Sequence, residues 1–128
     1  MKKTILLTLS IIILQSCAFD QKEYTKTITG KYALRKWLNP ITVVSLEFQN
    51  DSICCTGIID GCELVEFDTL NNIIFVKQNR NHVVIKLGNP NNVDDKPIYT
   101  KSQFSEKDFQ SALDSCTNCV TQYPTKDF

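Results

Sequence analysis

The chain has 128 residues, and its 14 Lys and Arg residues balance its 14 Asp and Glu residues, so its formal net charge is zero. This balance gives no basic surface for nucleic acid and no polybasic attraction to anionic lipid, so we predict no nucleic-acid partner. The length is typical of one domain, and the 42% hydrophobic content can form one core.

The first residues have the order of a secretory signal. Lys2 and Lys3 give a positive start, and an apolar run from Ile5 to Leu14 follows within an uncharged stretch that ends at Ser16. The run is too short for a membrane span, which needs about 20 apolar residues. We therefore predict that residues 1–16 are a signal peptide that is removed after export.

The end of this segment carries a resemblance to a known family. Leu14-Gln15-Ser16-Cys17 resembles the lipobox of bacterial lipoproteins. The resemblance implies cleavage before Cys17, acylation of Cys17 by fatty acids such as palmitate, and a lipid-anchored protein of the bacterial cell envelope that faces the periplasm or the cell exterior. More than one acyl chain makes such attachment stable. Without residues 1–16 the chain has 112 residues, with 12 basic and 14 acidic side chains.

The remaining chain divides into a tether and one domain. Residues 17–27 are mostly polar and lack apolar periodicity, so we predict a tether there and a single domain over residues 28–128. Strand-forming segments recur about every ten residues, with Asn, Asp, Gly and Pro between them. The expected strands are Ile28–Leu38, Thr42–Gln49, Ser52–Ile59, Cys62–Asp68, Asn72–Gln78, His82–Gly88 and Pro97–Thr100.

Short connections between these strands predict antiparallel neighbours. Asp60-Gly61 is the strongest hairpin signal, because Asp-Gly suits a type I′ turn. Alternation places one set of side chains on a core face and leaves the other face largely exposed to water; the core sets are Val44, Leu46 and Phe48, and Val83, Ile85 and Leu87. The predicted fold is mainly β: an antiparallel β-meander forming an open or closed small barrel, with one C-terminal α-helix.

The helix is predicted at about residues 106–115. Ser105 can cap its first turn, with Asp108 three residues later in the manner of a capping box. Phe104 and Phe109 are spaced for a hydrophobic staple across the cap.

Six cysteines in an exported chain predict disulfides. If Cys17 carries lipid, five remain: Cys54, Cys55, Cys62, Cys116 and Cys119. The odd number leaves at least one thiol without an intramolecular partner, and the sequence leaves the pairing open. Among the alternatives, we favour a bridge from the hairpin around Asp60-Gly61 to Cys116 or Cys119.

The cysteines also raise the question of chemistry. Cys116-Thr117-Asn118-Cys119 has the CxxC spacing of thiol-redox sites, but it follows the predicted helix, whose negative end disfavours a thiolate. The other cysteines lack zinc-ligand spacing. His82 is the sole histidine and is expected on the solvent side of its strand, so no multi-His metal site can form, and no serine has the nucleophile-elbow pattern of a catalytic triad. We predict no catalytic residue, no metal site and no cofactor.

A second resemblance is limited to one tripeptide. Gly30-Lys31-Tyr32 resembles the Gly-x-Trp opening of lipocalins. This resemblance implies a carrier of a small apolar ligand, with a cavity lined by Tyr32, Leu34 and Trp37.

These observations favour one function and leave two alternatives. We expect a small membrane-anchored envelope lipoprotein that binds another protein without catalysis, an inhibitor or immunity protein being one form of this. The alternatives are a lipocalin-like carrier and a thiol-redox protein that uses the CxxC pair.

Overall fold

The computed structural model of the protein describes residues 23–38, 41–49, 55–88 and 97–128. The elements, in chain order, are β1 (Glu23–Thr29), β2 (Tyr32–Trp37), β3 (Val43–Phe48), β4 (Thr56–Ile59), β5 (Leu64–Asp68), β6 (Ile73–Gln78), β7 (Asn81–Leu87), β8 (Tyr99–Phe104), α2 (Glu106–Asp114) and β9 (Cys119–Tyr123).

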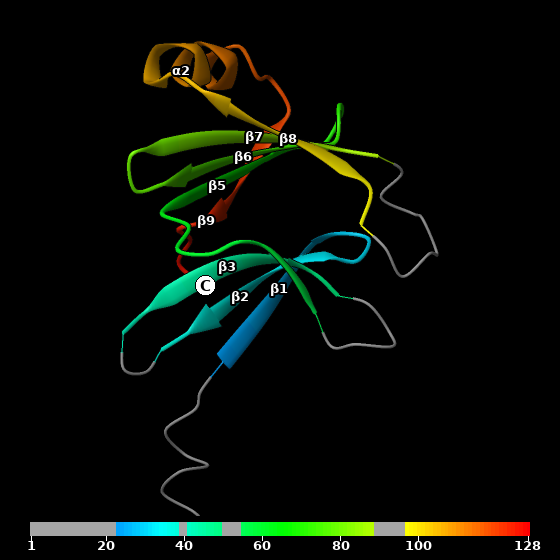
Figure 1. Ribbon diagram of the computed structural model, residues 1–128, viewed down its shortest axis with the longest axis vertical. Coiled ribbons are helices and arrows are strands. Elements are labelled where there is room, and N and C mark those ends of the chain that lie inside the picture. The colour runs from blue at the N-terminus through cyan, green and yellow to red at the C-terminus, as the bar shows by residue number, and fades with distance from the viewer. Residues whose placement is uncertain (1–22, 39–40, 50–54, 89–96) are drawn as a thin grey trace, which may run out of the picture.

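The strands form two antiparallel sheets. Sheet A has the order β1-β2-β3-β4, and sheet B has the order β8-β7-β6-β5-β9. Figure 1 shows sheet A below sheet B, with α2 above sheet B as a third layer. Within the described residues the two sheets do not close on each other. The prediction of a mainly β, antiparallel meander with one C-terminal helix is therefore confirmed, in its open form.

The main core fills the space between the two sheets. Its most deeply buried side chains come from both layers: Leu34, Val44 and Leu46 from sheet A, and Val65, Ile74, Val76 and Ile85 from sheet B. All alternate along their strands as expected for one buried face. The two predicted core sets, on β3 and β7, lie in this core.

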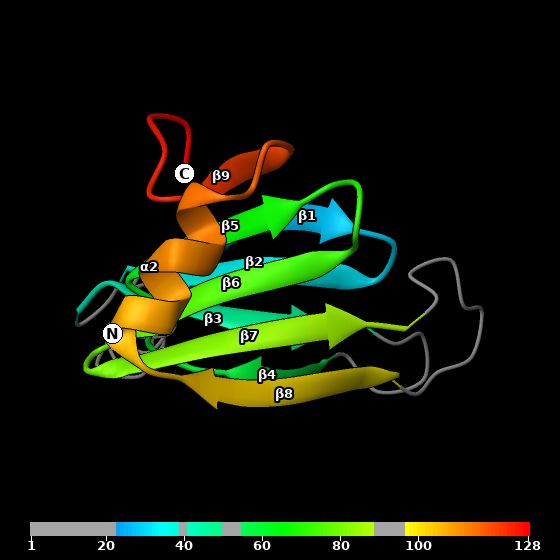
Figure 2. The ribbon, with the colours of Figure 1, turned by 90° about the horizontal axis from the view of Figure 1, so that it is seen from above.

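A second, smaller core lies on the outer face of sheet B. Phe75, Val84 and Phe109 are buried together there, and α2 lies across this face in Figure 2. The Phe109 ring lies 5.1 Å from the His82 ring, and His82 is only 9% exposed. The expectation of a solvent-side His82 is therefore wrong, because α2 covers the face that alternation alone assigns to water.

The helix itself follows its sequence signals closely. It begins at Glu106, and the Ser105 hydroxyl accepts a hydrogen bond from the Asp108 N–H at 3.1 Å. Phe104 packs against the same cluster as Phe109. Local capping residues were thus sufficient to place the helix to within one residue.

The N-terminal part of the domain differs from the expected boundaries. The expected strand Ile28–Leu38 is two strands, because Gly30 adopts a positive φ of 54° and reverses the chain. β1 starts at Glu23, so most of it lies in the polar stretch expected to be a tether. Backbone pairing with β2, which includes Glu23 with Trp37, holds β1 despite its polar side chains.

The Asp60-Gly61 connection is not a hairpin. Gly61 has the positive φ expected, 68°, but β4 belongs to sheet A and β5 to sheet B. The Cys62 N–H donates to the Val44 carbonyl in sheet A, and the next N–H, of Glu63, donates to the Lys77 carbonyl in sheet B. The chain therefore crosses between the sheets at this turn.

The C-terminal part contains more strand than expected. β8 extends to Phe104, beyond the predicted end at Thr100, and β9 pairs with β5 after the helix. β9 lies close to β1, since the Lys26 ammonium donates to the Gln122 carbonyl at 3.0 Å. Phe128 then packs against the main core.

Candidate functional site

The described cysteines do not form the bridge that we favoured. Cys116 and Cys119 form a disulfide with each other, with their Cα atoms 5.7 Å apart. The expected link from the Asp60-Gly61 turn to the helix end is therefore wrong. The helix ends at Asp114 and β9 starts at Cys119, so the chain turns back over these few residues and brings the two cysteines together. Cys17 and Cys54 lie outside the described residues.

The disulfide lies at the wrong end of the helix for thiolate chemistry. Both cysteines follow the last turn of α2, where carbonyl groups point outward and the helix dipole is negative. They pack beside the second core. This environment favours a structural bond that fixes the chain between α2 and β9 over a reactive thiol pair.

Cys62 and Cys55 have different surroundings. Cys62 is a buried free thiol, 5% exposed, and burial raises its pKa to about 12. Its thiol points at the Ile59 carbonyl, at 3.8 Å. Cys55 accepts a hydrogen bond from the Arg35 guanidinium. Because the thiolate is the reactive form, Cys62 is suited to packing rather than to chemistry.

The three residues expected to line a ligand cavity do not face one space. Tyr32 and Leu34 are 2% and 0% exposed and fill the main core. Trp37 lies on the opposite face of β2, 5.5 Å from the Arg35 guanidinium. The carrier alternative thus lacks the lining that it required.

Arg35 and Trp37 belong to a polar cluster on the outer face of sheet A. The Arg35 Nε lies 3.1 Å from a Glu47 carboxylate oxygen, and a second guanidinium nitrogen lies 3.7 Å from Glu23. The Glu47 residue is 9% exposed. These two ion pairs join β1, β2 and β3 across the face, with the Arg35 guanidinium between the two carboxylates.

A more distinctive feature is the turn between β5 and β6. The Asp68 carboxylate accepts hydrogen bonds from the Leu70 N–H at 3.0 Å, the Asn71 N–H at 3.1 Å and the Asn71 side-chain amide at 2.9 Å. The Asn71 side chain, with the backbone N–H groups of Asn71 and Leu70, lowers the Asp68 pKa below its usual value, against the opposing effect of burial. Leu70, at the tip, is 71% exposed. The hydrogen bonds to Asp68 thus hold the turn backbone in place, while the Leu70 side chain is exposed to water.

The turn is also tied to the disulfide segment. The N–H and the hydroxyl of Thr69 both donate to the Asn118 carbonyl, each at 3.2 Å. Asn118 lies between Cys116 and Cys119, so the disulfide restrains the residue that holds the turn. The two segments, about fifty residues apart in sequence, form one local unit.

Two further exposed apolar side chains lie at the same end of sheet B. Ile98 and Val120 are 52% and 51% exposed. Strand pairing places them there, since Ile98 directly precedes β8 and Val120 lies opposite Phe67 near the end of β5. We call Leu70, Ile98 and Val120 the far end.

Backbone hydrogen bonds join neighbouring strand ends at the far end. The Leu87 N–H donates to the Asn72 carbonyl at 2.9 Å, and the Gly88 N–H donates to the Ile98 carbonyl at 2.7 Å. A side chain at Gly88 would meet the Ile98 side chain at 2.7 Å, so glycine is required for this approach. The Ile98 carbonyl also accepts from the Tyr32 hydroxyl at 3.2 Å, which joins sheet A to this end.

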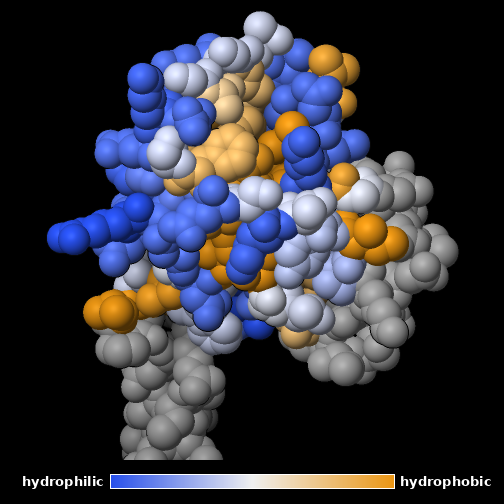
Figure 3. Space-filling model, turned by 45° about the horizontal axis from the view of Figure 1, so that its top comes forward, coloured by the Kyte–Doolittle hydropathy of each residue, from blue (hydrophilic) through white to orange (hydrophobic). Residues whose placement is uncertain are grey.

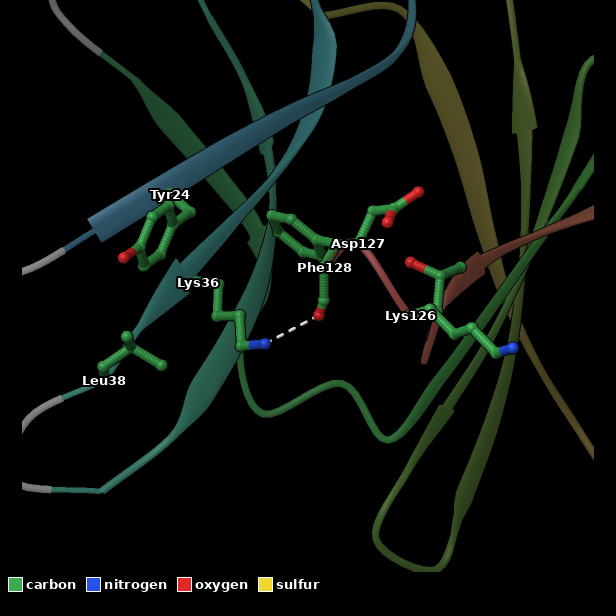
Figure 4. Close-up of a pocket in the computed structure, with 7 residues that line it drawn as sticks. Tyr24, Lys36, Leu38, Lys126, Asp127 and Phe128 are labelled. Carbon is green, nitrogen blue, oxygen red and sulfur yellow. Dashed lines mark hydrogen bonds between the residues drawn. The ribbon is translucent and has the colours of Figure 1, made fainter.

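The opposite end of the fold contains a shallow hollow of about 280 Å³, shown in Figure 4. Tyr24 of β1, Lys36 of β2 and Leu38, which follows β2, form one side, and residues 125–128 form the other. The Lys36 ammonium donates to the main-chain oxygen of Phe128 at 2.6 Å. The Phe128 ring also lies 6.2 Å from Tyr123 and close to two lysine ammonium groups. The C-terminal segment is thereby fastened across the edges of both sheets.

Neither Asp68 nor Leu70 was among the residues expected to have a role. A signal was present: Leu70 is the one large apolar residue in the polar run Asp68-Thr69-Leu70-Asn71-Asn72. An aspartate that begins a turn commonly accepts from the next backbone N–H groups.

Comparisons with known proteins provide no family: no family model, curated protein or solved structure matches the chain. Within the described residues, no group of three or more His, Cys, Asp or Glu side chains is arranged to hold a metal ion. None of the helices in the described part has the length and apolar character needed to cross a membrane.

Proposed function

We propose that this protein is a membrane-anchored lipoprotein of the bacterial cell envelope that binds another protein, without catalysis, through its far end. The anchor is Cys17, in the lipobox-like Leu14-Gln15-Ser16-Cys17. An inhibitor or immunity protein, which neutralises a toxin or hydrolase by binding it, is the specific form that a small anchored domain suits best.

The observation that carries the proposal is the presentation of Leu70. A large apolar side chain that is 71% exposed on an ordered turn is costly in water and becomes favourable when a partner covers it. Interfaces obtain most of their binding energy from a few residues near their centre. Because Asp68 and Asn118 already hold the turn, little conformational entropy is lost on binding.

The direction in which the far end points also supports the proposal. β1 starts at Glu23, six residues after Cys17, and pairs with the last residue of β2. The first residue of β2, Tyr32, contacts Ile98 at the far end. The far end therefore lies a full strand length away from the point where the anchored chain enters the fold.

The test is a capture experiment from native envelopes with matched variants. Leu70→Ser should remove a stoichiometric partner, while Ile41→Ser, which changes an equally exposed residue (69%) at the other end, should retain it. Fatty-acid labelling should be present in the wild type and absent in Cys17→Ser. A partner that survives Leu70→Ser and Ile98→Ser would refute the proposed binding surface, and labelling that survives Cys17→Ser would refute the anchor.

A further inference from the structure

The end of the fold where β1 begins is apolar at its tip. Tyr24, Leu38 and Ile41 are 51%, 37% and 69% exposed. Strand pairing gathers them, because Glu23 lies opposite Trp37 and Trp37 lies opposite Val43. We call Tyr24, Leu38 and Ile41 the near end. Figure 3 shows hydrophobic side chains projecting at the left of the molecule, where β2 ends and β3 begins in Figure 1.

The length of chain before β1 limits where this end can lie. Five residues lie between Cys17 and Glu23, so a fully extended connection of six residue steps reaches only about 20 Å. If Cys17 carries acyl chains in a bilayer, β1 begins within about 20 Å of the lipid headgroups. The near end is then the part of the described fold that lies next to the membrane.

The chemistry of the near end suits a bilayer surface. Tyr24 combines an apolar ring with a polar hydroxyl, the combination that favours the membrane–water interface. Lys126 lines the same hollow and is exposed, so its ammonium group can reach toward phosphate, whereas the Lys36 ammonium is held by the main-chain oxygen of Phe128. The acidic side chains nearby are Glu23, 3.7 Å from the Arg35 guanidinium, and Asp127 in the hollow.

We propose that the near end rests on the bilayer, with Leu38 and Ile41 entering the headgroup region and Tyr24 at its boundary. The proposal rests on the lipid anchor at Cys17 proposed above. Its consequence is a fixed orientation of the anchored domain, with the far end directed away from the membrane.

Trp37 provides a native probe for the test. It is the sole tryptophan of the chain and the last residue of β2, directly before Leu38 of the near end. Full-length lipidated protein would be reconstituted in phosphatidylcholine–phosphatidylglycerol vesicles whose acyl chains carry bromine close to the headgroup. Bromine quenches tryptophan emission only at short range.

The expected result is strong quenching of Trp37 emission by brominated vesicles, relative to vesicles without bromine. Ile41→Ser combined with Leu38→Ser should lower this quenching at least twofold. Leu70→Ser, a matched apolar-to-polar change at the far end, should leave it unchanged. The free energy of unfolding of the variants, measured in urea, verifies that each remains folded.

Three other outcomes would each contradict either the lipid anchor or the contact of the near end with the bilayer. Protein that fails to float with the vesicles contradicts the anchor, and with it the proposed function. Protein that floats, but whose Trp37 is unquenched by bromine and open to aqueous iodide, refutes the seating alone. Protein that floats with Trp37 protected from both quenchers shows that a protein, such as a second copy of the chain, covers the near end, and it also refutes the seating.

Discussion

Removing the Asp68 carboxylate should loosen the turn that carries Leu70. The carboxylate accepts three hydrogen bonds between 2.9 and 3.1 Å, and the residue is 6% exposed. A hydrogen bond to a charged group contributes about 1.5–3 kcal/mol, but bonds within one turn are lost together and do not add fully. We therefore expect Asp68→Ala to lower the free energy of unfolding by about 2–3 kcal/mol. Asp68→Asn, which keeps one acceptor oxygen, should lower it by about 1 kcal/mol.

The effect has a defined pH dependence. The folded-state pKa of Asp68 lies below the usual 3.8, so the folded state favours the carboxylate and releases its proton more readily than the unfolded chain. The contribution to stability is therefore complete above pH of about 4 and is lost as pH falls through the folded-state pKa. The stability difference between wild type and Asp68→Asn should shrink accordingly as the pH falls below about 4.

Urea unfolding at several pH values measures the stability difference, and amide hydrogen exchange measures the turn itself. The Leu70 and Asn71 amides should exchange faster in Asp68→Ala, while amides of β7 should change only with the global stability. Asp127→Ala removes an exposed carboxylate and should stay within about 0.5 kcal/mol of wild type. Unchanged exchange at Leu70, or a stability difference that is the same at pH 7 and pH 2.5 on the scale of about 0.5 kcal/mol, would refute the role of the carboxylate.

Other predictions concern the second core and the cysteines. Phe109→Ala should destabilise the domain by about 3–5 kcal/mol and expose the α2 amides first in hydrogen exchange, since the ring is 2% exposed; uniform exchange would contradict a separate helix layer. Replacing Cys116 and Cys119 by serine should cost about 2 kcal/mol, the entropy expected for so short a loop, and an unchanged melting temperature would argue against the bond. Iodoacetamide at pH 8 should leave Cys62 unmodified in the folded protein, as peptide mass spectrometry can detect, and rapid modification would contradict its burial and its pKa of about 12.

Features set by local sequence were predictable. The N-cap at Ser105 and the alternation on β3 and β7 depend on residues a few positions apart, and both agree with the structure. Their energetics are decided within one helical turn or one strand, so the rest of the fold has little influence on them.

Features set by distant contacts were not predictable. Asp60-Gly61 has the local conformation of a hairpin turn, yet successive N–H groups at Cys62 and Glu63 bond to different sheets. His82 is buried because α2, which begins more than twenty residues later, lies over it. The alternation of apolar and polar residues along a strand indicates which face a side chain occupies. It does not indicate what covers that face.

The candidate site shows the same division. The CxxC spacing singled out Cys116 and Cys119, but their mutual bond depends on the return of the chain into β9. Leu70 became a candidate only through its exposure and through the Asn118 carbonyl, which holds the turn from the other end of the sequence. Neither the exposure of Leu70 nor the contact with Asn118 can be obtained from a polar turn sequence alone.

Because β1 starts as early as Glu23, partner binding at the far end does not depend on membrane contact at the near end. A connection over residues 17–27 would reach about 35 Å and leave the domain free to rotate above a membrane, whereas one that ends at Glu23 reaches about 20 Å. β2 spans about 17 Å from Trp37 to Tyr32, so the far end lies beyond the near end by nearly the length of the connection. A partner could therefore approach Leu70 from outside even if the near end never touched lipid. Contact of Leu38 and Ile41 with lipid would add a fixed angle of approach, so it should alter the rate of association with a large partner more than the dissociation rate.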